Sequence, residues 1–158
     1  MKQLYIIRHG DSPFTQGGDD FERPLSEMGK YDAINIGLHL IEDYPRPSYI
    51  LSSAAKRAIT TARIIGGELE FDTTKIISAQ SLHNAPMETV LEEINQISEN
   101  HDCIMVFGHN PGLSMLASYL TGENFNLETC NTVLLNVEIE EWAELTKDTC
   151  TVNKFIAP

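Results

Sequence analysis

The sequence predicts an α/β protein, organised as a three-layer α/β/α sandwich in which helices cover both faces of a mostly parallel β-sheet. Two observations predict this fold class. Short apolar runs of strand-forming residues alternate with longer segments whose apolar residues recur at helical spacing, and this alternation is typical of parallel sheets. The chain also has 158 residues, enough to bury a substantial core. We therefore expect a single domain that covers residues 1–158.

The expected strands differ in the strength of their signal. The run LYII at 4–7 is continuously apolar, as in a strand that is buried on both faces. Two prolines exclude a helix just before YILSS, so a strand is expected at 47–53. The run DCIMVFGH at 102–109 is the clearest strand of all. Weaker strands are expected at 75–79, 131–140 and 150–156.

Helical spacing predicts one helix after each of the first four strands. Ser26 is a suitable N-cap for the first helix, because its hydroxyl can accept a hydrogen bond from the first turn. Pro111 suits the first turn of the last helix. The Gly-rich segment 15–24 is expected to be a loop over the end of the first strand. The four helices are expected at 26–44, 54–69, 87–100 and 111–120.

The composition limits the partners. The formal net charge of −12 argues against nucleic acids and anionic membrane surfaces. A phosphorylated substrate would need a local cationic pocket. Three widely spaced cysteines fit reduced thiols in a cytoplasmic protein, and no segment resembles a secretory signal or a membrane span. The dispersed histidines lack the spacing of a zinc site, and we expect neither a metal nor another cofactor.

Four polar residues follow the expected strands at one edge of the sheet, where ligands of open α/β sheets bind. Arg8 and His9 end the first strand, Arg57 begins the helix after the second, and His109 ends the fourth. We expect their side chains to meet around a phosphate-sized pocket, to which helix N-termini add partial positive charge. Taken singly, each has a structural alternative. Arg8 could be a salt-bridged strand end and His9 a core histidine. Arg57 could be a solvated helix residue and His109 an N-cap.

These residue types suit phosphoryl transfer. A neutral imidazole is a good nucleophile towards phosphorus, and a neighbouring guanidinium disfavours the protonated ring. Arginines hold phosphate oxygens in bidentate fashion and neutralise charge in the transition state. Gly10, next to His9, permits a sharp turn or a close backbone approach. Together they favour a two-step transfer through a phosphohistidine.

Several segments resemble those of a known family. LYIIRHGD resembles the Arg-His-Gly signature of the histidine phosphatase superfamily, which has the phosphoglycerate mutase-like fold, and SAAKRAITTA and VFGHNPG are similar to its other site segments. The chain is short and contains FERPLSEMG, features that resemble the SixA-type branch, whose members remove phosphate from phosphohistidine on histidine phosphotransfer domains. The resemblance runs from Lys2 to about Gly122, with Ala54 in place of the usual Pro and Thr60 in place of Gln.

The resemblance implies a role for each site residue. His9 would be the nucleophile, and Arg8, Arg57 and His109 would bind the phosphoryl group. His109 would also stabilise the transition state. Arg23 would be either a contact at the rim of the pocket or an exposed loop charge.

The resemblance does not extend to the general acid, for which this chain has no clearly matching residue. Relatives that act on phosphate esters supply a carboxylate after the third strand, where this chain reads QSLHNAPMET and offers only His83 and Glu88. Phosphohistidine needs less acid catalysis because its protonated imidazole leaves easily. The sequence therefore favours a phosphohistidine protein phosphatase over two alternatives: a small-molecule phosphomonoesterase of the same superfamily and a non-catalytic phosphoryl-binding module.

Overall fold

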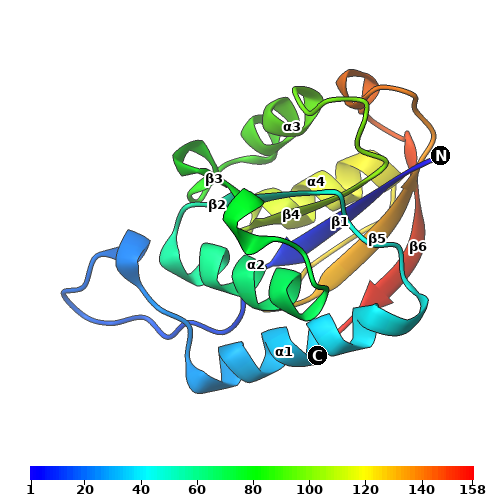
Figure 1. The fold of residues 1–158 in the computed structure, drawn as a ribbon. Coiled ribbons are helices and arrows are strands. Elements are labelled where there is room, and N and C mark those ends of the chain that lie inside the picture. Colours follow the sequence, from blue (N-terminus) through cyan, green and yellow to red (C-terminus); the bar gives the residue numbers. More distant parts are fainter.

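A computed structural model describes all 158 residues and contains one six-stranded sheet of order β3-β2-β4-β1-β5-β6 (Figure 1). Strands β3, β2, β4 and β1 run parallel to one another, whereas β5 is antiparallel to both of its neighbours, β1 and β6. The prediction of a mostly parallel sheet is therefore confirmed. The strands are β1 (Lys2–Arg8), β2 (Tyr49–Ser53), β3 (Ile77–Ala79), β4 (Cys103–Gly108), β5 (Thr132–Val137) and β6 (Cys150–Ile156).

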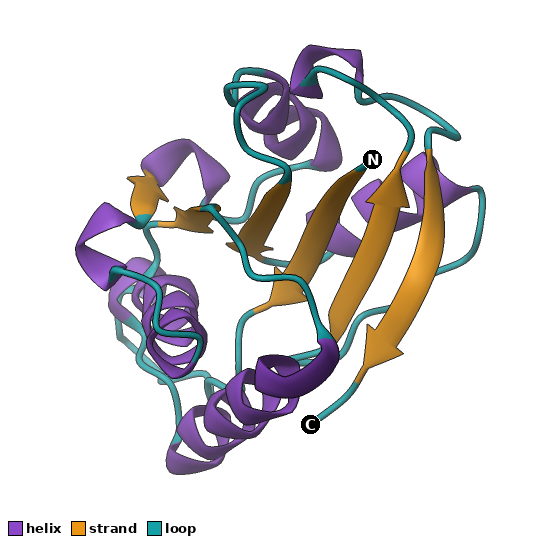
Figure 2. Ribbon diagram, turned by 45° about the vertical axis from the view of Figure 1, so that its right-hand side comes forward, coloured by secondary structure: helices purple, strands orange, loops and turns teal.

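Helices cover both faces of the sheet, as expected for three layers (Figure 2). Two of them, α1 (Glu27–Asp43) and α2 (Lys56–Glu68), lie on one face, while α3 (Met87–Asn95) and α4 (Gly112–Thr121) lie on the other (Figure 1). Ser26 caps α1, because its Oγ accepts a hydrogen bond from the Gly29 amide. Short 3₁₀ turns occur at Asp20–Glu22, Thr73–Lys75, Gln80–Leu82 and Trp142–Glu144.

Strand β1 separates two hydrophobic cores. Leu4 and Ile6 pack into the core beneath α3 and α4, and Tyr5 and Ile7 pack into the core beneath α1 and α2. All four side chains are fully buried. Successive side chains of a strand point to opposite faces, so a continuous apolar run is what a central strand of a three-layer fold requires.

The register of the two central strands brings their carboxyl ends together. Arg8 of β1 pairs with Gly108 of β4, and the amide of His9 donates to the Gly108 carbonyl at 3.1 Å. The residues that follow these strands, His9 and His109, therefore leave the sheet side by side.

Helix α3 is shorter than the sequence predicts. It ends at Asn95 instead of residue 100, because the amide of Ile97 bonds to Ile94, three residues back, and tightens the last turn. Ile97 nevertheless remains buried, which explains why the apolar pattern continues past the helix.

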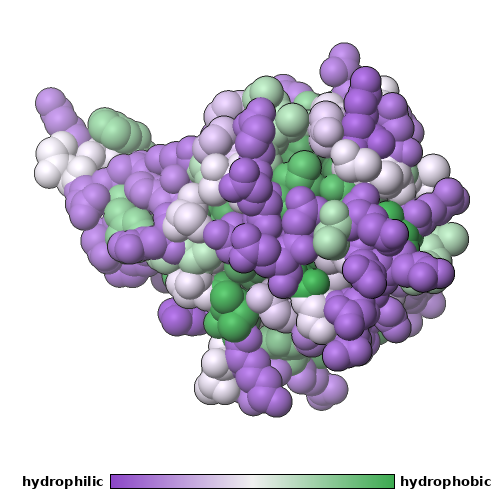
Figure 3. All heavy atoms as spheres, turned by 90° about the horizontal axis from the view of Figure 1, so that it is seen from above, coloured by the Kyte–Doolittle hydropathy of each residue, from purple (hydrophilic) through white to green (hydrophobic).

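The segment between β1 and α1 stands out from the body of the molecule (Figures 1 and 3). It includes the 3₁₀ turn Asp20–Glu22, in which the amide of Phe21 donates to the carboxylate of Asp19. The loop expected at 15–24 is thus partly ordered by its own hydrogen bonds.

Two further features of the chain concern its thiols and its hydrophobicity. The cysteines Cys103, Cys130 and Cys150 are all free and buried, and burial raises the pKa of their thiols to about 12, 12 and 11. No helix combines the length and the apolar character that crossing a bilayer requires.

Candidate active site

His9 and His109 lie next to each other where β1 and β4 end. Their ring centroids are 5.2 Å apart. Both side chains are buried, with 6% and 4% of their residue surface exposed. The pair owes its position to the β1–β4 register rather than to any direct bond between the two rings.

His9 is held with one ring nitrogen turned towards the site. Its Nδ1 lies 2.7 Å from the carbonyl oxygen of Gly10, which can only accept, so Nδ1 carries the proton. Its Nε2 accepts from Nε of Arg57 at 3.4 Å. Burial, together with the charges of Arg57, Arg8 and Arg23, lowers the pKa of His9 to about 4. At neutral pH, Nε2 therefore keeps its lone pair.

His109 is oriented by the hydroxyl of Ser53, whose Oγ lies 2.7 Å from Nε2 of the ring. Ser53 also accepts a hydrogen bond from the amide of Ala55, which leaves its own proton free to be donated to the ring. The proton of His109 then sits on Nδ1, a buried atom without a partner. Burial, followed by His9 and Arg57, lowers the pKa of His109 to about 3.

Arg57 and Arg8 supply the positive charge. Arg57 lies in the first turn of α2 and is 2% exposed. Arg8 donates from one guanidinium nitrogen to the carbonyl of Leu127 at 3.1 Å, and its buried Nε has no partner. Its charge lowers the pKa of both His9 and Arg57. The four residues expected to converge therefore do so.

The expected pocket between them is not among the cavities of this structure, and the carboxylate of Asp20 lies against Arg57. One oxygen of Asp20 accepts from Arg57, His83 and Asn84 at 3.1, 2.8 and 3.1 Å. The cavities of this structure, of about 400, 460 and 560 Å³, lie elsewhere, and none is lined by His9, Arg57 or His109.

The Asp20 carboxylate is anionic in this setting. The hydrogen bond from His83 lowers its pKa most, and Asn84, Arg57 and Arg23 lower it further against a smaller effect of burial. Sequence reasoning assigned no role to Asp20, since it lies in a loop whose conformation has no periodic signal. Asn84 and Ser53 were also missed.

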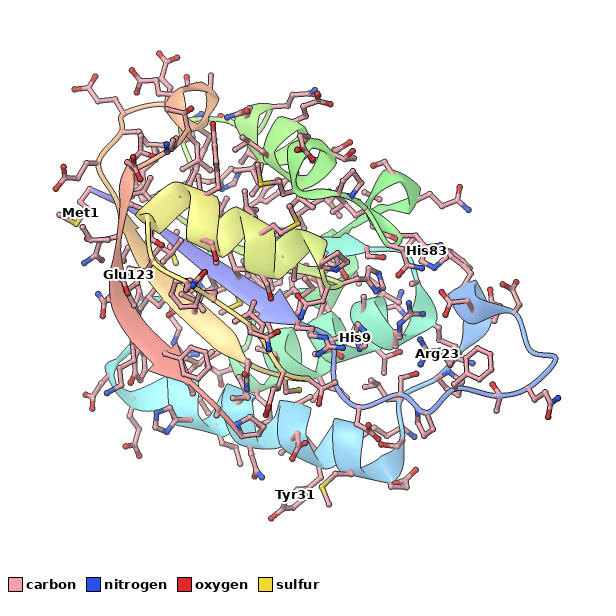
Figure 4. All side chains as sticks on the ribbon, turned by 180° about the vertical axis from the view of Figure 1, so that it is seen from behind. Met1, His9, Arg23, Tyr31, His83 and Glu123 are labelled. Atoms are coloured by element: carbon pink, nitrogen blue, oxygen red, sulfur yellow. The ribbon has the colours of Figure 1, made fainter.

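Of the other candidates Arg23, His83 and Glu88, the first two reach this site. Arg23 pairs with the second oxygen of Asp20 at 3.1 Å and also donates to the carbonyl of Ser12. His83 lies at the rim, 27% exposed, with its ring centroid 5.6 Å from that of His109. Figure 4 shows His83 and Arg23 on the same side of the molecule as His9. Glu88, in the first turn of α3, is exposed and forms no hydrogen bond or ion pair with these residues.

Thr61 supports the turn that follows His9. Its hydroxyl accepts from the amide of Gly10 at 3.0 Å and donates to the carbonyl of Arg57 at 2.7 Å, which joins α2 to the β1 end. A Cβ at Gly10 would lie 2.8 Å from the carbonyl oxygen of Gly29, so the close approach to α1 requires glycine. Thr60 bonds only to its own helix, at Lys56.

No group of three or more His, Cys, Asp or Glu side chains has the arrangement of a metal site. The site itself consists of two imidazoles and several guanidiniums, with the Asp20 carboxylate bound to Arg57 and Arg23. Residues 4–84 match the family model of the histidine phosphatase superfamily, branch 1. The chain belongs to the histidine phosphatase superfamily. This membership confirms the prediction of a phosphatase that acts without metal.

Relatives of this histidine phosphatase support the same placement. An uncharacterized chloroplastic protein of Arabidopsis thaliana is 32% identical over 152 residues, which cover 90% of this chain and 70% of that protein. A candidate phosphohistidine phosphatase SixA from Agrobacterium tumefaciens has a TM-score of 0.83 at 26% identity, covering 99% and 98% of the two chains. The protein histidine phosphatase SixA in complex with tungstate has a TM-score of 0.84 at 20% identity, covering 98% and 96%.

The fold is also shared with phosphatases of small molecules. A mycobacterial glucosyl-3-phosphoglycerate phosphatase has a TM-score of 0.68 at 14% identity, with 96% of this chain and 97% of that chain covered. The predicted phosphoglycerate mutase-like, SixA-type fold is thus confirmed by the SixA structures, which superpose more closely.

Proposed function

We propose that this histidine phosphatase hydrolyses phosphohistidine in a protein, such as a histidine phosphotransfer domain, through a covalent intermediate on His9. The observation that carries the proposal is the state of the His9 ring. Gly10 holds the proton on Nδ1, so Nε2 is unprotonated and its lone pair accepts a long hydrogen bond from Nε of Arg57.

In the first step, Nε2 of His9 attacks phosphorus and the P–N bond of the substrate breaks. The bonding electrons pass to the substrate imidazole, which takes up a proton from water. The Gly10 carbonyl stabilises the positive charge that develops on His9, because it accepts from Nδ1. Arg8, Arg57 and Nδ1 of His109 bind the phosphoryl oxygens, and Arg23 supports this charge from the rim.

In the second step, a water oxygen attacks phosphorus and the bond to Nε2 breaks. Its electrons return to Nε2, so the neutral ring is regenerated and inorganic phosphate is released. The proton that the attacking water loses neutralises the hydroxide left by the first step. Neither step needs a carboxylic acid from the protein. This fits a site whose nearest carboxylate, Asp20, has a lowered pKa and cannot hold a proton at neutral pH.

The substrate proposal rests on this lack of an acid and on the similarity to SixA structures. The leaving group of a phosphate ester is an alkoxide, which needs a proton donor. The leaving imidazole of phosphohistidine is basic enough to be protonated from water. The rim at Asp20 and His83 is partly exposed, 39% and 27%, so the side chain of a protein substrate could enter there.

Quench-trapping with a ³²P-labelled phosphohistidine protein tests the proposal. The wild-type chain should retain label in an acid-labile, base-stable form, and His9→Ala should retain none. His39→Ala is the matched control, because His39 is exposed on α1 and should leave labelling unchanged. Label on His9→Ala would refute the assignment of the nucleophile.

The second candidate is a small-molecule phosphomonoesterase, favoured by the fold shared with the glucosyl-3-phosphoglycerate phosphatase. A panel of phosphohistidine protein, free phosphohistidine, sugar phosphates and nucleotides separates the two. Faster turnover of any oxygen ester than of phosphohistidine would favour the second candidate. Tight binding of a phosphopeptide without phosphate release would instead indicate a phosphoryl-binding module.

A further inference from the structure

Arg57 has almost no hydrogen-bonding capacity left for a substrate. A guanidinium carries five N–H groups, and four of those of Arg57 already have acceptors. These acceptors are Nε2 of His9 at 3.4 Å, the carbonyl oxygen of Asp20 at 2.8 Å, and the side-chain oxygens of Asp20 and Asn84, both at 3.1 Å. Bidentate binding of a phosphoryl group needs two N–H groups, so an existing partner must leave.

Asp20 is the partner whose displacement would free the most N–H groups of Arg57. It occupies both terminal nitrogens of Arg57, one through its backbone carbonyl and one through its carboxylate. It also belongs to the segment that projects from the body of the molecule between β1 and α1 (Figure 1). By contrast, His9 is fixed by the end of β1.

We propose that Asp20 is an internal anion that occupies the phosphoryl position of Arg57 in the free enzyme, so that only an anion able to displace it binds the site. The inference rests on the proposed role of Arg57 as a ligand of the phosphoryl group. It makes Asp20 a specificity-determining residue, distinct from the nucleophile and from the phosphoryl ligands.

The selectivity follows from the competition. A tethered carboxylate acts at a high effective concentration, in the millimolar range for short flexible tethers. A monoanionic carboxylate in solution offers Arg57 no more than Asp20 already does, and must also lose its own freedom. A tetrahedral dianion offers more oxygens and more charge, and can also take the unpartnered Nδ1 of His109 and Nε of Arg8. Phosphoryl groups would therefore enter where carboxylates do not.

Calorimetric binding of tungstate, inorganic phosphate and acetate tests this without any turnover. In Asp20→Ala, tungstate and phosphate should bind about 10- to 100-fold more tightly than in the wild type, the range expected for one charged hydrogen-bonding partner. Acetate should show no measurable binding to the wild type but should bind detectably to Asp20→Ala. Asp20→Asn keeps a hydrogen-bond acceptor but loses the charge. Its anion affinities should therefore lie between those of the wild type and those of Asp20→Ala.

Asp19→Asn is the matched control. Asp19 lies next to Asp20, is exposed, and caps the same 3₁₀ turn without contacting Arg57; asparagine also caps well. This variant removes the same charge from the same loop, so its anion affinities should stay within about twofold of the wild type. An equal gain in Asp19→Asn and Asp20→Ala would mean general repulsion and would overturn the proposal, as would unchanged or weaker binding in Asp20→Ala.

A second measurement uses the unmodified chain, in case the Asp20 variants fail to fold. The ¹³C-carboxyl signal of Asp20 is followed against pH with and without saturating tungstate. Displacement of the carboxylate from His83, Asn84 and Arg57, which together lower its pKa, should raise the pKa of Asp20 towards its ordinary value. A carboxyl that still titrates as low with tungstate bound has not been displaced, which would refute the proposal. Loss of phosphohistidine hydrolysis would leave both measurements intact, so this proposal and the proposed function fail independently.

Discussion

Nε of Arg57 donates to Nε2 of His9 across 3.4 Å, so the most buried cation of the site rests against the atom proposed as nucleophile. The contact does two things at once. It adds to the effect of burial in keeping the imidazole neutral, because a positive neighbour disfavours protonation. It also places the guanidinium where a phosphoryl group on Nε2 would present its oxygens.

Replacing this arginine should therefore be costly. Arg57→Lys keeps the charge but loses the planar fork, and we expect kcat/KM for phosphohistidine protein to fall by about 10²- to 10³-fold, as for the loss of a preorganised donor. Arg63→Lys on the exposed side of the same helix is the control and should retain wild-type activity. A similar loss in both variants would point to the stability of α2 instead.

The titration of His9 provides a second prediction. Because burial and three arginines lower its pKa to about 4, its ¹⁵N ring signals should show a neutral ring with the proton on Nδ1 from pH 8 down to about pH 5. Protonation should appear only near pH 4. Protonation of His9 near the ordinary histidine value of about 6.5 would contradict the site described above.

The hydroxyl of Ser53 should decide which nitrogen of His109 carries the proton. In Ser53→Ala, Nε2 loses its donor, and the ring is free to change tautomer. We expect the ¹⁵N spectrum of His109 to change and phosphate affinity to fall about tenfold. Ser52→Ala is the matched control: Ser52 is equally buried on β2, but its hydroxyl bonds to the Ser53 carbonyl and not to His109.

Both buried histidines should make stability depend on pH. Their pKa values of about 4 and 3 lie below the ordinary 6.5, so the unfolded chain binds more protons than the folded chain between those values. The free energy of unfolding should therefore rise with pH across that window, by at most about 1.4 kcal/mol per pH unit for each ring. Urea denaturation at pH 4.5, 5.5 and 6.5 measures this slope. In His109→Gln the slope should be smaller than in the wild type, and an unchanged slope would contradict this prediction.

Thr61 should contribute to stability as well as to the site. Thr61→Val leaves the buried amide of Gly10 without its acceptor, and we expect the free energy of unfolding to fall by about 1–3 kcal/mol. Thr60→Val is the matched control, since its hydroxyl makes the same bond to its own helix but reaches no other element. An equal effect of the two substitutions would assign the loss to helix α2 alone.

The sequence predicts the framework of this site well, because the framework depends on local patterns. Apolar runs end at Arg8 and at Gly108, and parallel strands bring such ends to one edge. The positions of His9, Arg57 and His109 follow from that geometry alone. A helix or strand can be predicted when the spacing of its apolar residues, its length and its flanking prolines all indicate the same kind of element.

What could not be predicted depends on contacts between distant loops. Asp20 reaches Arg57 only because the segment after β1 folds back towards His83 and Asn84, and no periodicity marks such a path. The expectation of an open pocket was wrong for the same reason. Likewise, Ile97 extends the helical apolar pattern although it lies beyond α3, since a buried turn and a helix satisfy the same spacing.

The three buried cysteines have a practical consequence. Cys103 and Cys130 belong to the packing around the α1–α2 side of the sheet, and Cys150 to the opposite side. With pKa values raised to about 11–12, none offers a thiolate to an alkylating reagent while the chain is folded. Carbamidomethylation by iodoacetamide therefore records how often each half of the molecule opens, and it does so without any added reporter group.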